Sequence, residues 1–250
     1  MLILRQLRLE SNNNKRTIYF GKAETKDDLL GIFKLRYDVY SQHDYIDTSK
    51  YTDGLEKDKY DQLGKCHYFI AVLENKVIGC IRVIIDDPLP TEVDFLFSEP
   101  EALKEIPRNN RSELGRFIII PPNKENKDYL PRGLIMLFLL DVLSSFGLKN
   151  NLLGGYAFIK KSLEQKMKKM RMPIGKIENY QQRYPEDGVL YKYFNQLNDP
   201  VVPIYFITRD FYDYSERHIK NSFMFRRDEN NVFTLRENIY TDFLKALKII

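Results

Sequence analysis

Residues 112–120 read SELGRFIII and are the most informative stretch of the chain. The run from Phe117 to Ile120 is apolar, which predicts a strand that is buried on both faces. The Pro-Pro pair that follows is expected to end this strand. Glu113 and Arg116 bring opposite charges to its start, where each must be paired or solvated. A structural ion pair is the commoner explanation of such residues, and a functional site is the alternative.

The segments that flank this strand predict a hairpin before it and a buried helix after it. Residues 67–73 and 76–85 are apolar or alternating and are separated by Glu74-Asn75, which is the pattern of a β-hairpin. Residues 132–146 are apolar on nearly every side except at Asp141, as expected of a buried helix. Further strands are expected at residues 17–20, 152–158 and 201–209, and further helices at 25–41, with a capping box of Thr25 and Asp28, and at 159–172.

This order of elements predicts a single α/β domain over residues 1–250, with a mixed sheet flanked by helices. An antiparallel front half joined to a parallel βαβαβ tail resembles the GNAT acyltransferase architecture. Residues 1–16 are expected to form an N-terminal arm, and residues 210–250 a C-terminal extension. Residues 42–63 show no clear period and are long for a loop, which indicates a functional segment or a lid.

Composition predicts a soluble cytoplasmic protein. Of the 250 residues, 43% are hydrophobic and 30% are charged, which is ordinary for a globular domain. The net charge of +4 is too small to indicate nucleic-acid binding. The longest apolar run, residues 133–140, is too short for stable insertion in a membrane, and the N-terminus does not have the pattern of a signal peptide. Cys66 and Cys80 are expected to be reduced thiols of the core.

Four motifs between residues 35 and 118 resemble those of the autoinducer-synthase superfamily and occur in the same order. This superfamily comprises acyl-homoserine-lactone synthases, N-acyl amino acid synthases and exosortase-associated acyltransferases, which have a GNAT-like fold. The motifs are LRYDVYSQ with Arg36 and Tyr40, DGLEKDKYDQLGKCHYFIAV with Asp58 and Asp61, VIGCIRVI with Arg82, and SELGRFII with Glu113 and Arg116. The second motif is closer to the amino-acid and exosortase-associated branch than to the lactone synthases.

Two departures from the family pattern concern the amine substrate more than the fold. The tryptophan that lactone synthases carry after the first helix is missing, and Tyr45 or Ile46 lies near its place. Gly115 replaces the serine that is usual before the arginine of the last motif. Beyond residue 172 the chain resembles nothing in the family closely.

The resemblance implies an N-acyltransferase that moves a fatty acyl group from an acyl-carrier-protein thioester to the amine of an amino acid or of S-adenosylmethionine. Such a reaction needs a base for the amine and donors for the developing oxyanion. Glu113 is the candidate base, acting through water. The strand from Arg116 through Phe117 to Ile118 would supply backbone N–H donors. The alternative for Glu113 is a structural ion pair with Arg36, Arg82 or Arg116.

The other candidate residues divide into an ion-pair network and an apolar tunnel. Arg36, Arg82 and Arg116 are expected to pair with Asp58 and Asp61 and to hold residues 42–63 over the site, and one of these arginines could instead bind a substrate carboxylate. The alternative is a set of surface ion pairs that contribute little to stability. The acyl tunnel would draw on Phe117, Ile119, Leu137, Phe138, Tyr156 and Phe158, and Tyr40 and Ile118 are further candidate substrate-binding residues. Apolar residues at such spacing are more often ordinary core.

The acyl donor is predicted from one absent motif and one basic helix. The GNAT pyrophosphate loop, Q/R-x-x-G-x-G/A, is missing, and the corresponding residues 124–135 contain only a lone Arg132-Gly133. This favours acyl-phosphopantetheine on a carrier protein over acyl-coenzyme A, with no permanently bound cofactor. Basic residues that could steer an acidic carrier protein are Lys160, Lys161, Lys166, Lys168 and Lys169. A solvated helix face is the alternative.

Two other functions remain open: a coenzyme A-dependent GNAT acetyltransferase, and a nonenzymatic module that binds a carrier protein. Metal and Ser-His-Asp chemistry have little support, because His43, His67 and His218 are isolated in the sequence. No metal site is therefore predicted.

Overall fold

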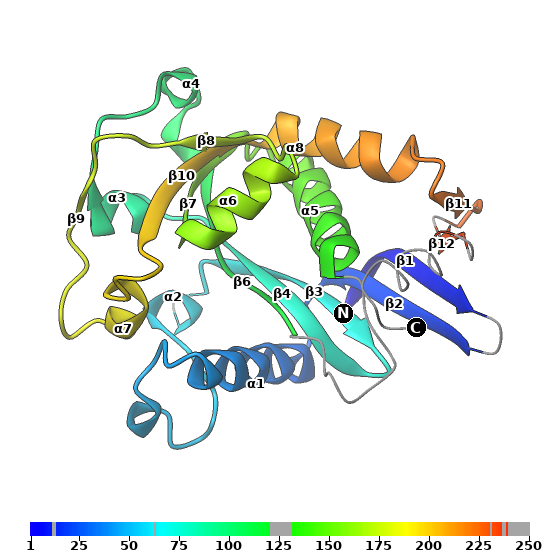
Figure 1. Ribbon diagram of the computed structural model, residues 1–250, viewed down its shortest axis with the longest axis horizontal. Coiled ribbons are helices and arrows are strands. Elements are labelled where there is room, and N and C mark those ends of the chain that lie inside the picture. The colour runs from blue at the N-terminus through cyan, green and yellow to red at the C-terminus, as the bar shows by residue number, and fades with distance from the viewer. Residues whose placement is uncertain (12–13, 63, 121–131, 231, 237–238, 240–250) are drawn as a thin grey trace.

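A computed structural model of the protein describes residues 1–250 except 12–13, 63, 121–131, 231, 237–238 and 240–250 (Figure 1). The strands of its large sheet are β1 (Leu2–Ser11), β2 (Asn14–Lys22), β3 (Cys66–Leu73), β4 (Lys76–Ile84), β6 (Arg111–Ile119), β7 (Gly154–Lys160), β8 (Ile174–Lys176), β10 (Val201–Ile207), β11 (Phe225–Arg227) and β12 (Val232–Leu235). They lie in the order β11-β12-β1-β2-β3-β4-β6-β7-β10-β8. A separate pair consists of β5 (Phe95–Leu96) and β9 (Gln181–Gln182).

The helices are α1 (Lys26–Gln42), α2 (Lys59–Gln62), α3 (Pro90–Asp94), α4 (Glu101–Lys104), α5 (Arg132–Lys149), α6 (Lys161–Lys169), α7 (Tyr191–Phe194) and α8 (Thr208–Ser215). The predicted cap of α1 is confirmed, because the backbone N–H of Asp28 donates to Thr25 Oγ1 and that of Thr25 donates to Asp28 Oδ2. The β3–β4 hairpin is also confirmed, and its turn residues Glu74 and Asn75 have φ of 50° and 62°.

Two apolar cores cover the two faces of the sheet, as expected of a mixed α/β domain. In β3, Phe69 and Ala71 belong to the core that contains α5 residues, while Ile70 faces the core that contains α1 residues. The prediction of a buried α5 is confirmed, and its single internal charge, Asp141, accepts a hydrogen bond from Arg5 Nε at 2.8 Å. Among the described helices, none combines the length and the apolar character that a bilayer span requires.

The directions of the strands confirm the mixed sheet and correct its last part. Neighbouring strands from β1 to β6 are antiparallel, and the α5 crossover makes β7 parallel to β6. However, β10 is antiparallel to β7, so the predicted βαβαβ tail stops after its first unit. The reason is that the chain reaches Pro200 beside the end of β7, where Pro200 accepts from Lys161 N–H at 2.9 Å, and β10 therefore starts where β7 finishes.

The first residues of the chain were predicted to be an arm and instead form β1 and the start of β2. Leu7 and Leu9 are buried and Arg8 is exposed, which is the alternation of a strand with one buried face. The C-terminal extension contributes β12, which pairs with β1 in parallel. The predicted end of the strand at Pro121-Pro122 lies outside the described residues.

Candidate active site

The sheet opens between β6 and β7. These parallel strands pair from Arg111 and Gly154 to Leu114 and Ala157, and both continue beyond the last of these pairs. A β-bulge lies on β6 at the same place, because Gly115 and Ile118 are opposite Arg82 and Cys80, so that two residues of β6 face one residue of β4. Arg116 has φ of 53° within the bulge, which accounts for the change of direction there. The regular pairing of β6 is thus interrupted by a bulge at Arg116.

A cavity of about 320 Å³ lies in this opening. Tyr40 of α1 and Leu140 of α5 both line it, and these two residues belong to opposite faces of the sheet. The cavity therefore passes from one face to the other through the gap between β6 and β7. Its apolar lining includes Phe117, Ile118, Ile119, Phe158, Met167, Leu190, Ile204, Phe206 and Phe211.

A second cavity, of about 260 Å³, lies beside the first and is more acidic. The two cavities share the lining residues Gly115, Arg116, Phe158 and Leu190. Acidic and aromatic side chains line the second one, among them Asp58, Tyr60, Asp94, Glu113 and Tyr184. The bulge on β6 is thus the partition at which an apolar space and a polar space meet.

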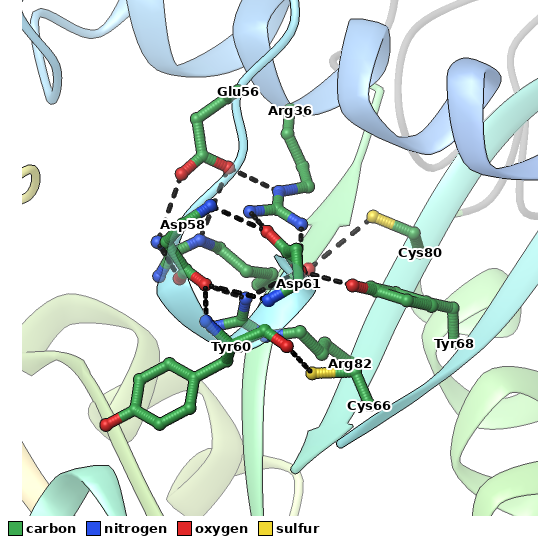
Figure 2. A network of polar contacts seen from close by, with 10 residues as sticks. Arg36, Glu56, Asp58, Tyr60, Asp61, Cys66, Tyr68, Cys80 and Arg82 are labelled. Carbon is green, nitrogen blue, oxygen red and sulfur yellow. Dashed lines mark hydrogen bonds and ion pairs between the residues drawn. The ribbon is translucent and has the colours of Figure 1, made fainter. Parts of the chain in front are cut away.

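A buried ion-pair cluster holds the segment 42–63 against the sheet (Figure 2). Arg36 binds Asp61 in bidentate fashion, at 3.1 Å and 2.9 Å, and its Nε donates to Glu56. Arg82 donates to Asp58 at 2.7 Å and to Asp61 at 2.8 Å. Because these five residues come from α1, β4 and the segment, the cluster fixes the segment in place rather than leaving it as a free lid.

Arg116 completes this cluster, so that three arginines face three carboxylates. It donates to Glu56 Oε1 at 3.0 Å and to Asp58 Oδ2 at 2.8 Å. All these side chains are at most 8% exposed, and the predicted alternative of surface pairs is therefore wrong. Burial alone would raise the pKa of Asp58 and Glu56, but Arg116 and its arginine neighbours hold both pKa values below their ordinary range.

Glu56 was not among the predicted residues, although it accepts from two arginines. Its carboxylate is fully buried between Arg36 and Arg116. The sequence contains a signal for it, since Glu56 lies two positions before Asp58 in an extended segment and can point to the same side. The family motif itself contains only the two later carboxylates, Asp58 and Asp61.

Glu113 lies apart from the ion-pair cluster, so the alternative of a structural ion pair with Arg36, Arg82 or Arg116 is wrong. Within the described ranges its carboxylate forms no ion pair, and its Oε2 accepts from the backbone N–H of Thr91 at 2.6 Å. The side chain is 1% exposed and lines the acidic cavity. Burial raises the pKa of Glu113 to about 8, although the hydrogen bond from Thr91 opposes this shift. A carboxyl group in such a state can exchange a proton near neutral pH.

The predicted tunnel residues divide into two groups. Phe117, Ile119 and Phe158 line the large cavity, as do the candidate substrate-binding residues Tyr40 and Ile118. The other three, Leu137, Phe138 and Tyr156, do not line it and are core residues. Phe138 stacks on Phe20 with ring centroids 5.1 Å apart, and Phe97 packs edge-on against Tyr156 at 5.3 Å. These three side chains point away from the opening because they lie before the strands diverge or on another face of α5.

The five predicted basic residues are also not equivalent. Lys161 and Lys168 pair with Glu164, at 2.9 Å and 2.5 Å, within α6. Lys166 and Lys169 are exposed. Lys160 belongs to β7 and not to the helix, and it is 6% exposed, so its prediction as a surface residue is wrong.

Comparisons with known proteins agree with this architecture. Residues 31–148 match a family model described as N-acyl amino acid synthase FeeM. The structure of FeeM, an N-acyl amino acid synthase from uncultured soil microbes, is similar with a TM-score of 0.51 and 13% identity, covering 78% of this chain and 93% of FeeM. BjaI, a CoA-dependent acyl-homoserine lactone synthase solved with MTA, is similar with a TM-score of 0.50 and 16% identity, over 77% of this chain and 82% of BjaI. No curated protein matches the sequence of the chain. The predicted fold class is confirmed by these likenesses.

Proposed function

We propose that this chain is an acyltransferase of the autoinducer-synthase superfamily and that it transfers a fatty acyl group from an acyl-carrier-protein thioester to the amine of an amino acid. The observation that carries the proposal is the meeting of an apolar cavity and an acidic cavity at the β6 bulge. An acyl chain is apolar and matches the apolar cavity, and the zwitterionic end of an amino acid matches the acidic cavity. The thioester carbonyl would then lie at Gly115 and Arg116, where the cavities join.

The reaction proceeds from this placement. The ammonium group of the acceptor gives one proton to the Glu113 carboxylate, and the free amine attacks the thioester carbonyl. The oxyanion that forms accepts hydrogen bonds from backbone N–H groups of the bulge between Arg116 and Ile118, which the extra residue frees from the ladder. Breaking the C–S bond leaves an amide and a thiolate, which takes up a proton to become a thiol, and the second proton of the amine is released. A pKa of about 8 for Glu113 suits this exchange, because it lies closer to the pKa of an amine than the pKa of an ordinary carboxyl group does.

The acidic cavity also supports an acceptor that carries a carboxylate. Arg82 lines it, and the buried Nε of Arg82 is without a hydrogen-bond partner in the described structure. Lys59, on the rim, adds a second cation. An amino-acid carboxylate would satisfy both groups, while its ammonium faces Glu113 and Asp94. Burial raises the pKa of Asp94 to about 6, so at neutral pH this side chain contributes negative charge toward the ammonium.

S-adenosylmethionine is the second candidate acceptor, since it has the same amino and carboxylate groups. Structures of BjaI hold SAM or MTA, which is a property of that protein. A competition assay distinguishes the two acceptors. Both are offered together with one acyl donor, and the product is either an N-acyl amino acid or an acyl-homoserine lactone.

Lipid extracts of cells that express the protein test the proposed function, with a Glu113→Gln strain as control. New N-acyl amino acids or acyl lactones, identified by mass spectrometry and missing from the control, are the expected result. Purified protein is then assayed with acyl carrier protein and a panel of amino acids, which covers the case of a host that lacks the acceptor. Failure to acylate any amine from a carrier-protein or coenzyme A thioester would overturn the proposal.

The carrier-protein donor gives a further prediction on α6. Lys166 lines the apolar cavity near its opening, and Lys169 lies one turn further along the helix. Reversal of both charges, Lys166→Glu with Lys169→Glu, is expected to raise the KM for acyl carrier protein about tenfold at low salt, because carrier proteins are acidic. The KM for acyl-pantetheine, which lacks the carrier protein, should stay within about twofold of wild type. Lys104→Glu on α4, another exposed lysine, is the control.

A further inference from the structure

Lys160 is a buried ammonium group that faces the apolar cavity. Its side chain is 6% exposed, and it lines the cavity with Phe117 and Phe158. Within the described part of the chain, no carboxylate lies within ion-pair distance of its Nζ. Such a charge is costly to bury without a counter-charge, so its position calls for a chemical explanation.

The surroundings of Lys160 hold the ammonium group in place without neutralising it. Nζ donates to the backbone oxygen of Tyr193 and lies 4.3 Å from the centroid of the Tyr193 ring and 5.4 Å from that of Tyr45. The nearby carboxylate, Asp199, is engaged by the N–H and the hydroxyl group of Ser162, at 2.8 Å and 2.7 Å. Burial lowers the pKa of Lys160 to about 8, although Asp199 opposes the shift. The other titratable groups around this cavity are Tyr40, His43, Arg116, Arg132 and Lys166.

The position of Lys160 relative to the bulge follows from the strand register. Leu114 and Ala157 are the last paired residues of β6 and β7. Phe117 and Lys160 each lie three residues beyond that pair, on opposite sides of the opening. A thioester whose carbonyl oxygen lies at the bulge must therefore hold its sulfur in the space between the two strands, which Lys160 borders.

We propose that Lys160 is the catalytic acid for the leaving thiol, donating a proton to the sulfur as the C–S bond breaks. This inference rests on the proposed acyl transfer. When the tetrahedral intermediate collapses, the electron pair of the C–S bond moves to sulfur, and the Lys160 ammonium supplies the proton that makes it a thiol. Neutral Lys160 regains a proton from water, so the enzyme returns to its starting state. The acceptor ammonium loses two protons in all, and the net release is one.

The test compares two acyl donors with the same acyl chain, one on pantetheine and one on thiophenol. Thiophenol is the more acidic thiol and leaves without protonation. For Lys160→Met we expect kcat to fall about 100-fold with acyl-pantetheine and less than about threefold with the thiophenyl ester, because general acid catalysis contributes only where the leaving group needs a proton. Lys149→Met, at the exposed end of α5, should leave both rates unchanged.

Lys160→Arg keeps the buried charge but cannot release its proton at neutral pH. It is expected to lose rate with acyl-pantetheine as Lys160→Met does, and it takes the place of that variant if the latter does not fold. Equal losses with both donors would assign Lys160 a purely structural role and overturn the inference. This outcome is distinct from failure of the proposed function, in which the wild-type protein would transfer the acyl group from neither donor.

Discussion

Replacement of Glu113 by glutamine is expected to lower kcat for acyl transfer by about 100-fold to 1000-fold while the protein remains folded. Glutamine keeps the shape of the side chain, and its amide oxygen can still accept from Thr91 N–H. It cannot take a proton from the acceptor. The loss is therefore chemical, and the KM for the acyl donor should change little because Glu113 lines the acidic cavity and not the apolar one.

The pH dependence of the rate separates this role from a loss of packing. The ratio of wild-type to Glu113→Gln rates is expected to fall as the pH rises above about 8, the pKa of the Glu113 carboxyl group. Wild type uses the ammonium form of the acceptor, whose proton Glu113 accepts, whereas the variant can use only acceptor that is already deprotonated and therefore gains on wild type at alkaline pH. Glu105→Gln, at an exposed carboxylate after α4, is the matched control and should follow the wild-type profile. A constant ratio across this range would remove Glu113 as the base.

Glu113→Gln is expected to stabilise the protein at alkaline pH, whereas the loss of an ion-paired buried carboxylate would destabilise it. The pKa of Glu113 is raised in the folded protein, so between about pH 4.5 and 8 the folded state binds more protons than the unfolded state. Wild-type stability therefore falls as the pH rises through this window. At pH 9 the free energy of unfolding of Glu113→Gln, measured by denaturant unfolding, should exceed that of wild type by more than ~1 kcal/mol. The difference should shrink at pH 4.5.

Glu56→Gln is expected to cause the largest loss of stability, about 3–5 kcal/mol in the free energy of unfolding. Its carboxylate is fully buried and accepts from both Arg36 and Arg116, so its removal leaves two buried cations with too little negative charge. Asp53→Asn is the matched control, since Asp53 lies in the same segment with a side chain that is 56% exposed. That variant should stay within about 0.5 kcal/mol of wild type in denaturant unfolding.

Acid should lower the stability that the ion-pair cluster contributes, and Glu56→Gln tests this. The pKa values of Glu56, Asp58 and Asp61 are lowered in the folded protein by their arginine partners. The stability that these carboxylates contribute is present above their unfolded pKa and is lost as the pH falls toward their lower folded values. The free energy of unfolding of Glu56→Gln should therefore fall less steeply with acid than that of wild type. A parallel acid dependence would show that the cluster contributes no net stability through Glu56.

Local patterns in the sequence were sufficient for several elements of this fold and, with the exception of Glu56, for the members of its ion-pair network. The hairpin turn at Glu74-Asn75, the capping box at Thr25 and the buried helix α5 each depend on residues close together in the chain. The network was also predictable, because a guanidinium in an apolar strand, such as Arg82, has few stable arrangements other than pairing with carboxylates. The second family motif indicated which carboxylates of residues 42–63 are the partners, namely Asp58 and Asp61.

Tertiary structure alone decided where the reactive groups lie. The divergence of β6 and β7 after Leu114 and the reversed direction of β10 depend on how distant segments return to the sheet, and no local period records them. The same is true of the state of Glu113 and Lys160. Each is an ordinary charged residue in the sequence, yet among the described residues Glu113 forms no ion pair with an arginine, and Lys160 donates to Tyr193 without a carboxylate partner. The sequence determined which charges the interior contains, and long-range packing determined which of them remain unpaired, because pairing depends on distances between segments and not on spacing along the chain.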